Sequence, residues 1–532
     1  MNAERKAAFE LRGLMLDPAR LTERHEYYFE LLPHLADWGY NTLWWHFCDD
    51  EGLALELECY PDLASPYALT RRETADFIEA AAEEGIDVVP EVETLGHSLW
   101  ITGKQRFSHL FDGMPYGHNA ICPSHPETME ILGPIIEEVA ELFPGRFFHA
   151  GLDEAVFSGC PRCSRRGEGR PEWWVFAEHV KAVYEAVKSA GKEMIMWADG
   201  MEKHPDLLGE FPRDIVMAHW HYGDIPEEKI APTVEAGFRI VCVPAIQTVI
   251  QPARKNMENI NGMIDLASRL SNRGCTGMVA TWWEPFRVLR DAVFPAIAVT
   301  GKAMGKGRPA DWQRDVTGFA GRFFGIADEE AAGALWETLS HTITREEFLY
   351  LYADSAADLF DSILLASGTG FGKRLAETED ALKALQSARS EVNKNHAIFD
   401  SLLLAARITA VALKNASRLR EAFGYYRESE RAVGYAGPHE DLLEKLEKAS
   451  GLLADIRDDV SAVTADTEAE WDRTRYSKDP KKDNSSPEMR QRSRKALLGN
   501  MMRSRQYYRK LAEKIQKDIE RFGAGGPFPG GL

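Results

Sequence analysis

The stretch Phe147-Phe-His-Ala-Gly-Leu-Asp-Glu154 decides the fold of this chain. It is a short apolar run that ends in two adjacent carboxylates. Similar apolar, β-rich runs recur through about the first 300 residues, and an amphipathic stretch follows each of them. With this one, the runs are Leu11–Asp17, Thr42–Phe47, Asp87–Val92, Phe147–Glu154, Glu193–Asp199, Ile215–His221, Arg239–Ala245 and Gly277–Trp283.

The stretches between these runs have the period of amphipathic helices. Examples are Arg72–Glu84, Glu127–Leu142, Trp174–Ala190 and Asn256–Ser271. Apolar strands that alternate with helices predict a parallel sheet covered by helices, and eight such units predict closure into a (β/α)8 TIM barrel. A doubly wound open sheet is the alternative, but no Gly-rich phosphate turn follows Leu11–Asp17.

The character of the sequence changes after about residue 310, where long helical patterns replace the strands. They cover Glu377–Asn393, Ala397–Phe423, Glu440–Ala462 and Glu488–Phe522. We therefore predict an α/β barrel over 1–308, an α-helical C-terminal domain over 309–523 and a flexible Gly- and Pro-rich tail over 524–532. The helical domain would pack on the barrel or on a second subunit, and the second arrangement would make a homodimer.

Composition narrows the class of protein. The chain has 532 residues, 44% of them hydrophobic, and a net charge of −20, which argues against a nucleic-acid partner. We expect no secretory signal at the N-terminus and no membrane span, because no run of 18 apolar residues occurs. Seven scattered cysteines then indicate reduced thiols and a cytoplasmic location. No dinucleotide, phosphate-loop or haem motif is found, so we expect no cofactor.

The predicted C-terminal ends of the strands carry many carboxylates and tryptophans. In a TIM barrel this is the face that holds the active site. Indole rings stack on the apolar faces of sugars, and carboxylates accept hydrogen bonds from sugar hydroxyls, so this rim predicts a carbohydrate pocket. Its residues are His46, Asp49, Asp50, Glu91, Glu93, His97, Asp153, Glu154, Trp197, Asp199, Trp220, Tyr222, Trp282, Trp283 and Glu284.

The adjacent pair Asp153-Glu154 constrains the chemistry. Neighbours on a strand point to opposite sides, so the pair is not suited to flank one glycosidic bond as acid and nucleophile. Adjacent carboxyls suit two neighbouring substrate atoms instead. One holds an acetamido N–H while the other protonates the leaving oxygen, and the substrate's own acetamido carbonyl is the nucleophile.

Four segments together resemble glycoside hydrolase family 20, and most closely its short hexosaminidase D type. They are Arg12-Gly-Leu-Met-Leu-Asp17, Pro90-Glu-Val-Glu-Thr-Leu-Gly-His97, His149-Ala-Gly-Leu-Asp-Glu154 and Met196-Trp-Ala-Asp199. The resemblance covers about residues 9 to 300. It implies an exo-acting, retaining β-N-acetylhexosaminidase that removes terminal β-linked GlcNAc or GalNAc from an oligosaccharide or glycoconjugate through an oxazolinium intermediate.

The resemblance also implies roles for individual residues. Glu154 would be the general acid/base, with its pKa raised, and Asp153 would orient the acetamido group. Arg12 would bind ring hydroxyls, although it lies at the start of its strand. His97 would hold the acid together with Asp49 or Asp50, and His149 would support the pair. The remaining expected substrate-binding residues are Trp197, Asp199, Trp220, Tyr222, Trp282 and Glu284.

Two features depart from a simple match. Longer family members carry a Tyr after the seventh strand, but Val243-Pro-Ala-Ile-Gln-Thr248 has none, so Tyr222 is the expected substitute. This absence keeps a sugar-binding protein without turnover as an alternative, beside a glycosidase for another β-glycoside. Cys160-Pro-Arg-Cys163 has no second C-x-x-C pair, so we expect a mobile loop there and no metal.

Overall fold

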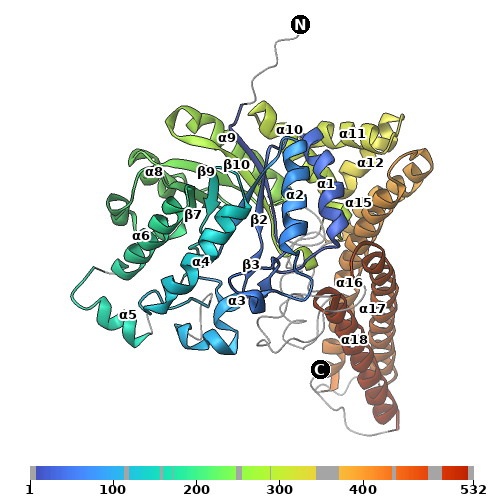
Figure 1. Cartoon of the computed structure of the whole chain (residues 1–532). Coiled ribbons are helices and arrows are strands. Elements are labelled where there is room, and N and C mark those ends of the chain that lie inside the picture. The colour runs from blue at the N-terminus through green and yellow to red at the C-terminus, as the bar shows by residue number, and fades with distance from the viewer. Residues whose placement is uncertain are drawn as a thin grey trace.

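The computed structural model describes residues 8–112, 119–155, 160–171, 173–246, 254–287, 289–342, 371–433, 439–476 and 494–524. Its centre is a closed barrel of eight parallel strands, in the order β1-β10-β9-β8-β7-β6-β5-β2 (Figure 1). The barrel strands are β1 (Leu11–Leu16), β2 (Thr42–His46), β5 (Asp87–Glu91), β6 (Phe147–His149), β7 (Glu193–Trp197), β8 (Val216–Trp220), β9 (Arg239–Val243) and β10 (Cys275–Trp282). The TIM barrel predicted from the sequence is therefore confirmed.

Alternate residues of each strand point into the barrel. In β1, Leu11 and Met15 face the interior, whereas Leu14 and Leu16 pack against the surrounding helices. The interior is filled with large apolar side chains, among them Trp44 and Trp197. This filling leaves the C-terminal ends of the strands as the place where polar groups gather.

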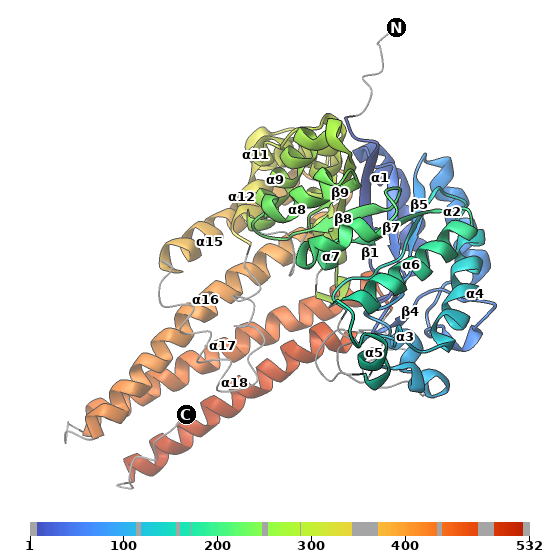
Figure 2. The ribbon, with the colours of Figure 1, turned by 90° about the vertical axis from the view of Figure 1, so that its left-hand side faces the viewer.

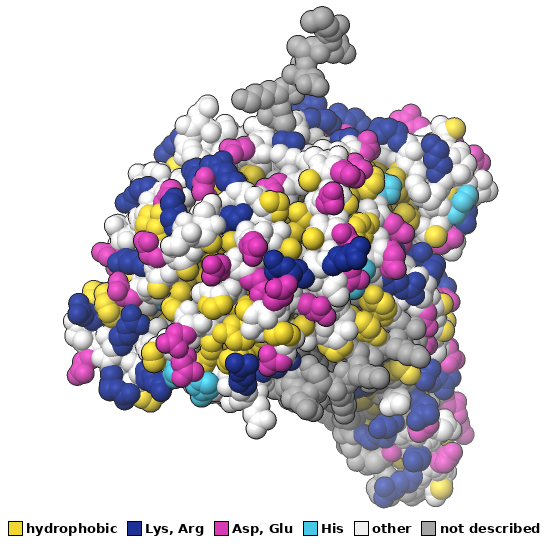
Figure 3. Space-filling model, viewed as in Figure 1, with side chains coloured by type: hydrophobic (Ala, Val, Ile, Leu, Met, Phe, Trp, Pro, Cys, Tyr) yellow, Lys and Arg dark blue, Asp and Glu magenta, His cyan; other side chains and the backbone are white. Residues whose placement is uncertain are grey.

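Helices cover the outside of the barrel. They are α1 (His25–Trp38), α2 (Arg71–Glu83), α4 (Glu127–Leu142), α6 (Trp174–Ser189), α8 (Glu227–Glu235), α9 (Arg254–Leu270) and α10 (Phe294–Lys306), and α7 (Asp199–Lys203) follows β7. The loops after β2, β5 and β6 hold the strand pair β3 (Cys48–Asp49) and β4 (Gly52–Leu53) and the short helices α3 (Leu99–Thr102) and α5 (Pro161–Arg166). Acidic and basic side chains are interspersed over the face shown in Figure 3.

The C-terminal part is helical. Its described helices are α11 (Trp312–Phe323), α12 (Glu329–Ser340), α15 (Phe371–Ala388), α16 (His396–Val433), α17 (His439–Thr474) and α18 (Arg494–Gly523). The last three run side by side away from the barrel (Figures 1 and 2). The expected division at residue 308 falls between α10 and α11, where Gly307 adopts a left-handed φ of 59°.

Helix α16 is the one described helix that is long and apolar enough to cross a membrane, over His396–Ser429, and 56% of its most apolar window is buried. Its Arg407 and Lys414 form ion pairs with Asp466 and Asp459 of α17. Burial and these pairs show that the apolar stretch packs into the helical bundle.

The end of α17 docks onto the C-terminal rim of the barrel. The guanidinium of Arg475 lies 2.8 Å from the carboxylate of Glu23, in the loop after β1, and also donates to the carbonyl of Pro285, after β10, at 2.8 Å. Both charged side chains are almost fully buried, at 3% and 4% exposed. Nearby, Arg473 pairs with Asp291 at 3.0 Å. The helical region is thus attached to the same end of the barrel that carries the candidate site.

Candidate active site

The Asp153-Glu154 pair lies in a turn beyond β6. The apolar run predicts both residues on the strand, but β6 ends at His149. Gly151, Leu152 and Glu154 have left-handed φ angles of 65°, 76° and 45°. A Cβ at Gly151 would lie 2.1 Å from a carboxylate oxygen of Glu93 and 3.1 Å from its Cα, so a larger residue would be strained there. A left-handed turn, and not strand alternation, therefore sets the directions of the two carboxylates.

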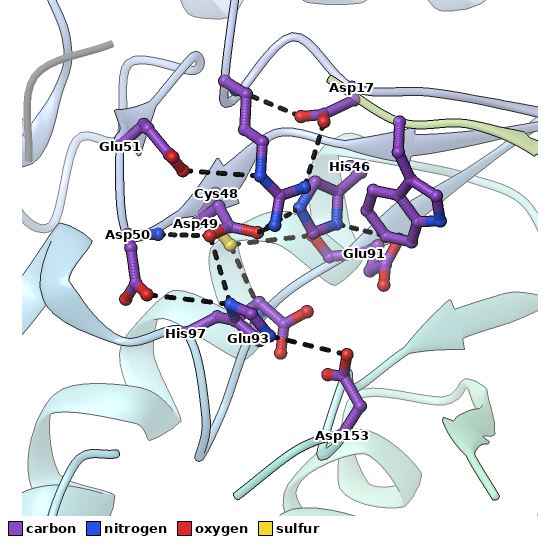
Figure 4. A network of polar contacts seen from close by, with 12 residues as sticks. Asp17, His46, Cys48, Asp49, Asp50, Glu51, Glu91, Glu93, His97 and Asp153 are labelled. Carbon is purple, nitrogen blue, oxygen red and sulfur yellow. Dashed lines mark hydrogen bonds and ion pairs between the residues drawn. The ribbon is translucent and has the colours of Figure 1, made fainter. Parts of the chain in front are cut away.

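His97 connects two groups of carboxylates (Figure 4). Its Nε2 lies 3.7 Å from Asp153 Oδ2 and 3.4 Å from Glu154 Oε2. Its Nδ1 lies 3.3 Å from Asp49 Oδ1 and 3.7 Å from Asp50 Oδ2. The loop after β5 also touches the turn that holds Asp153 directly, because a Cβ at Gly96 would lie 2.4 Å from the carbonyl oxygen of Asp153. The imidazole is thus fixed between the strand ends of β2 and β6.

A buried polar layer lies around the top of β2 and β5. His46 Nε2 contacts Asp49 Oδ2 at 2.8 Å, and its Nδ1 contacts Glu91 Oε2 at 3.1 Å. The indole N–H of Trp197 donates to Glu91 Oε1 at 2.8 Å. These contacts lock the inward-facing side chains of β2, β5 and β7, and they hold Asp49 in position toward His97.

Burial sets the protonation of the site. Burial raises the pKa of Asp153 to about 7, with the His97 charge acting in the opposite direction and Asp199 and Glu91 adding to the rise. Burial opposes the charge on His97, but Asp49 and Asp153 outweigh it and raise the pKa of the imidazole well above its usual value. Burial, together with the charge of Asp153, raises the pKa of Glu93 well above the usual range. These shifts favour the charged form of His97 and the protonated form of Glu93.

The pKa of Asp49 is shifted in the opposite direction. Its burial is outweighed by Arg20 and His97, which hold the pKa of its carboxyl well below the usual range. Asp50 anchors neighbouring backbone, accepting from the Leu99 N–H at 3.2 Å and from Asn119 Nδ2 at 2.9 Å. Both aspartates therefore face His97, and Asp50 also anchors the loop after β5.

The barrel is similar to known proteins. Residues 9–268 match the model of the glycosyl hydrolase family 20 catalytic domain. The match runs from just before β1 into α9, so it covers most of the barrel. The chain is 29% identical over 282 residues to a beta-hexosaminidase of Vibrio furnissii, covering 46% of this chain and 45% of that protein. It is 25% identical over 250 residues to the human beta-hexosaminidase subunit beta, covering 44% of each. The chain thus spans less than half the length of these relatives.

A solved structure resembles a larger part of the chain. The X-ray structure of a chitobiase from Flavobacterium johnsoniae has a TM-score of 0.50, covers 83% of this chain and 75% of that chain, and is 17% identical. This likeness concerns the fold, and it extends beyond the barrel into the helical region. The short hexosaminidase D type suggested by the sequence stays a prediction.

The family 20 match implied a sugar-binding role for Arg12, and the structure corrects this. Arg12 lies at the N-terminal end of β1, where its side chain donates to the carbonyls of Gly39 and Phe9 at 2.8 Å each. It also faces outward, since Leu11 and Met15 are the inward residues of β1. Arg12 is therefore at the wrong end of the barrel to reach a substrate at the strand ends.

Arg20, which the sequence analysis did not select, occupies the C-terminal end of β1. It lies 3.0 Å from Asp17 and 2.6 Å from Asp49, and its guanidinium lies over the ring of Trp283 at 5.1 Å. The side chain is 14% exposed, so it retains an open edge. Its position three residues after the apolar run Leu11–Asp17 was the available sequence signal.

A second correction concerns the tryptophans of β10. Met278, Ala280 and Trp282 pack against the helices, so Trp282 points away from the barrel interior. Trp283 points inward instead, with its ring 4.9 Å from His46 and 6.2 Å from Trp197. Both tryptophans lie at the predicted rim, and the prediction that Trp282 binds the substrate was wrong because alternation gives the side only when the register is known.

Tyr222 lies against the inward tryptophans. The indole N–H of Trp283 donates to Tyr222 Oη at 2.6 Å, and the ring of Trp220 lies 5.3 Å from the ring of Tyr222. Both Trp220 and Tyr222 are half-buried. Trp197, in contrast, is 1% exposed and lies beneath the site, in contact with Glu91. The accessible aromatic wall therefore consists of Trp220, Tyr222 and Trp283.

The other selected residues serve the backbone around the site. His149 Nδ1 accepts from the N–H of Gly151 at 3.1 Å, and burial lowers the pKa of this histidine to about 4, so it is neutral. Asp199 accepts from the N–H of Glu154 at 3.2 Å and pairs with Lys203 at 2.9 Å. Glu284 pairs with Arg287 at 2.7 Å, on the rim beside Arg20. His149 and Asp199 thus hold the turn that presents the two carboxylates.

Proposed function

We propose that this chain is an exo-acting, retaining β-N-acetylhexosaminidase that hydrolyses terminal, non-reducing β-linked GlcNAc or GalNAc by substrate-assisted catalysis. One observation carries the proposal. Adjacent Asp153 and Glu154 face one imidazole, with their oxygens 3.7 and 3.4 Å from His97 Nε2, at the C-terminal end of a family 20 barrel. The substrate is an oligosaccharide or glycoconjugate, and no cofactor takes part.

The chemistry follows from the unequal surroundings of the two carboxyls. Glu154 is 34% exposed, so it faces the space where a leaving group sits, whereas Asp153 is 11% exposed. In the first step Glu154 gives its proton to the glycosidic oxygen as the C1–O bond breaks. The acetamido carbonyl oxygen bonds to C1, and Asp153 accepts the acetamido N–H. The cationic oxazolinium is stabilised by the negative charge of Asp153.

The second step reverses the first. Glu154, now a carboxylate, takes a proton from water while the water oxygen bonds to C1 and the oxazolinium ring opens. Two displacements at C1 retain the anomeric configuration. A pKa of about 7 for Asp153 in the free protein means that a bound acetamido N–H, which favours the charged carboxylate, helps to ionise it.

The surroundings of the pair suit a single sugar ring. Arg20 offers a planar cation for hydroxyl groups beside the indole face of Trp283, and Trp220 and Trp283 supply apolar ring surface. We assign the acetamido carbonyl to the hydroxyl of Tyr222, which Trp283 fixes in place. This assignment would replace the tyrosine missing from Val243–Thr248, of which Gln247 and Thr248 lie outside the described residues.

The first test is turnover of an aryl β-N-acetylglucosaminide by the wild type and by Glu154→Gln. The variant keeps the shape of the side chain but has no acid proton to donate. We expect kcat to fall by about 100-fold or more, in line with general acid catalysis. Glu83→Gln, a surface change at the end of α2, is the matched control. Full activity in Glu154→Gln would overturn the assignment of the acid.

A second test separates substrate assistance from an enzyme nucleophile. A thiazoline that mimics the oxazoline is expected to inhibit competitively, and Asp153→Asn should weaken this inhibition. A covalent glycosyl-enzyme that can be trapped, without thiazoline binding, would refute the mechanism. Rates on aryl β-glucoside, β-GlcNAc and β-GalNAc substrates then establish whether the acetamido group is required and which configuration is preferred.

A further inference from the structure

Four potential metal ligands converge next to the active site, on residues that the catalytic proposal does not use. Asp112 and Cys122 come from the long loop after β5, and Cys160 and Cys163 come from the loop after β6. All four side chains are buried, and their ligand atoms lie within 4.8 Å of one another.

The distances match a single tetrahedral ion. Cys122 Sγ lies 3.4 Å from Cys160 Sγ and 3.7 Å from Cys163 Sγ, and Cys163 Sγ lies 3.3 Å from Asp112 Oδ2. A tetrahedral zinc with Zn–S of about 2.3 Å and Zn–O of about 2.0 Å requires edges of about 3.8 Å between sulfurs and about 3.5 Å between sulfur and oxygen. The observed distances are shorter by only a few tenths of an ångström.

The backbone holds each pair rigidly. Phe111 and Ile121 form an antiparallel bridge, and beside it the N–H of Asp112 donates to Ala120 O at 3.1 Å and that of Cys122 donates to Leu110 O at 2.7 Å. Cys160 precedes α5, where its carbonyl accepts from the N–H of Ser164 at 2.9 Å. The ligand side chains are therefore placed by two independent pieces of secondary structure.

The surroundings provide an apolar shell and leave one polar atom unsatisfied. Val175 packs with the three cysteines in a small separate cluster, and Trp174 packs against it. Asp112 is 5% exposed, and its Oδ1 has no hydrogen-bond partner among the described residues. A buried carboxylate beside three sulfurs is costly unless a cation compensates it.

We propose that Asp112, Cys122, Cys160 and Cys163 bind one structural zinc ion. Three thiolates and one carboxylate are a borderline-soft donor set that suits Zn²⁺, and four protein ligands close the tetrahedron, which is the pattern of a structural site. The spacing of Cys160-Pro-Arg-Cys163 predicts no metal, because the sequence has no second pair of this kind. The missing ligands, Asp112 and Cys122, instead come from another loop, where nine residues separate them.

The ion has a defined mechanical role. It links the loop that carries His97 to the loop that carries Asp153 and Glu154, and these loops already touch where Gly96 faces the carbonyl of Asp153. Cys160 follows Glu154 by only six residues. A zinc at this place therefore fixes both partners of the His97–Asp153 contact against each other, without contacting the substrate.

The test measures metal in the full-length protein, purified under reducing conditions from zinc-supplemented cells. We expect about one zinc per chain, released by a mercurial and detected with a chromogenic chelator. Cys163→Ser and Asp112→Asn should reduce the bound zinc several-fold and lower Tm. Cys59→Ser is the matched control, because this cysteine is half-buried outside the cluster, and it should keep the full zinc content.

A second measurement is independent of how well the variants fold. Cobalt(II) exchanged into the wild-type protein should give the thiolate charge-transfer and ligand-field absorption of a tetrahedral site. Wild-type protein without zinc and without such a cobalt spectrum overturns the proposal, as does intact mass showing the loss of two hydrogens in a disulfide among these cysteines. Zinc content does not depend on which glycoside is hydrolysed, so failure here is distinguishable from failure of the hexosaminidase proposal.

Discussion

Replacing His97 by Gln tests the electrostatics of the site most directly. The imidazolium lies 3.7 Å from Asp153 Oδ2, and the two side chains are 7% and 11% exposed, so solvent screens the pair only weakly. The His97 charge already lowers the pKa of Asp153, which burial raises to about 7. Glutamine retains an N–H donor of similar reach but removes the charge.

The expected size of the change in the pKa of Asp153 follows from Coulomb's law. Two unit charges at 3.7 Å interact by about 4 kcal/mol at an effective dielectric constant of about 20. This corresponds to about 3 pH units as an upper limit, since one unit is about 1.4 kcal/mol. Water that enters the site of the variant would stabilise the Asp153 carboxylate and so reduce the rise in its pKa. We therefore expect the pKa of Asp153 to rise by at least about one unit.

The direction of the change in the pKa of Asp153 determines how the pH profile of the variant differs from that of the wild type. Catalysis needs ionised Asp153, so the rate falls as the pH drops through the pKa of this group. Without the His97 cation that pKa is higher, and the acidic limb of kcat/KM should move upward from about pH 7. The assay is kcat/KM for an aryl β-N-acetylglucosaminide from pH 5 to 9. His25→Gln, which affects an ion pair with Glu73 on α2, is the control. An acidic limb that stays in place or moves to lower pH would refute this electrostatic reasoning.

Four further outcomes are expected. Asp153→Asn should abolish most activity yet raise Tm, and the rise should be larger at pH 8 than at pH 5. The pKa of Asp153 is raised in the folded state, so the wild type loses stability as the pH rises through about 7. An equal change in Tm at both pH values would contradict this. Arg20→Lys keeps the charge but loses the planar fork, so kcat/KM should fall about 10- to 100-fold, equivalent to about 1.5–3 kcal/mol, and an unchanged KM would argue against sugar contact. Trp283→Phe removes the N–H that donates to Tyr222, and kcat/KM should fall about 3- to 10-fold, or about 0.5–1.5 kcal/mol; a matching loss in Trp282→Phe would assign the effect to packing. Arg475→Ala leaves Glu23 buried without its partner and should cost about 3–5 kcal/mol of stability, seen as a lower Tm, and Glu23→Gln in the same chain should restore part of it.

The barrel was predictable because its strands are buried on both faces. Such strands are apolar along their whole length, and all eight overlap the runs read from the sequence. The end of β6 was not predictable in the same way. Left-handed φ angles at Gly151 and Leu152 terminate the strand before Asp153, and a leucine in that conformation has no signature in the sequence.

The candidate site was partly predictable for a related reason. The carboxylates and His97 lie where strand ends converge, and the structure brings them together. The prediction of Trp282 was wrong because the choice between adjacent Trp282 and Trp283 depends on register, and that of Arg12 because it lies at the N-terminal end of β1. Arg20 lies beyond the C-terminal end of β1, and Trp283 points into the barrel. The cysteine cluster needed two loops in contact, which no spacing along one loop reveals.

The contact between Arg475 and Glu23 also has a consequence for how the protein is made. The two residues are 452 positions apart, yet they form a buried pair at the rim of the barrel. On the ribosome, the barrel strands emerge long before α17, and domains generally fold as they emerge. Until Arg475 arrives, Glu23 must remain hydrated and the loops after β1 and β10 lack their clamp. The nascent barrel therefore acquires its finished rim only after most of the helical region has been synthesised.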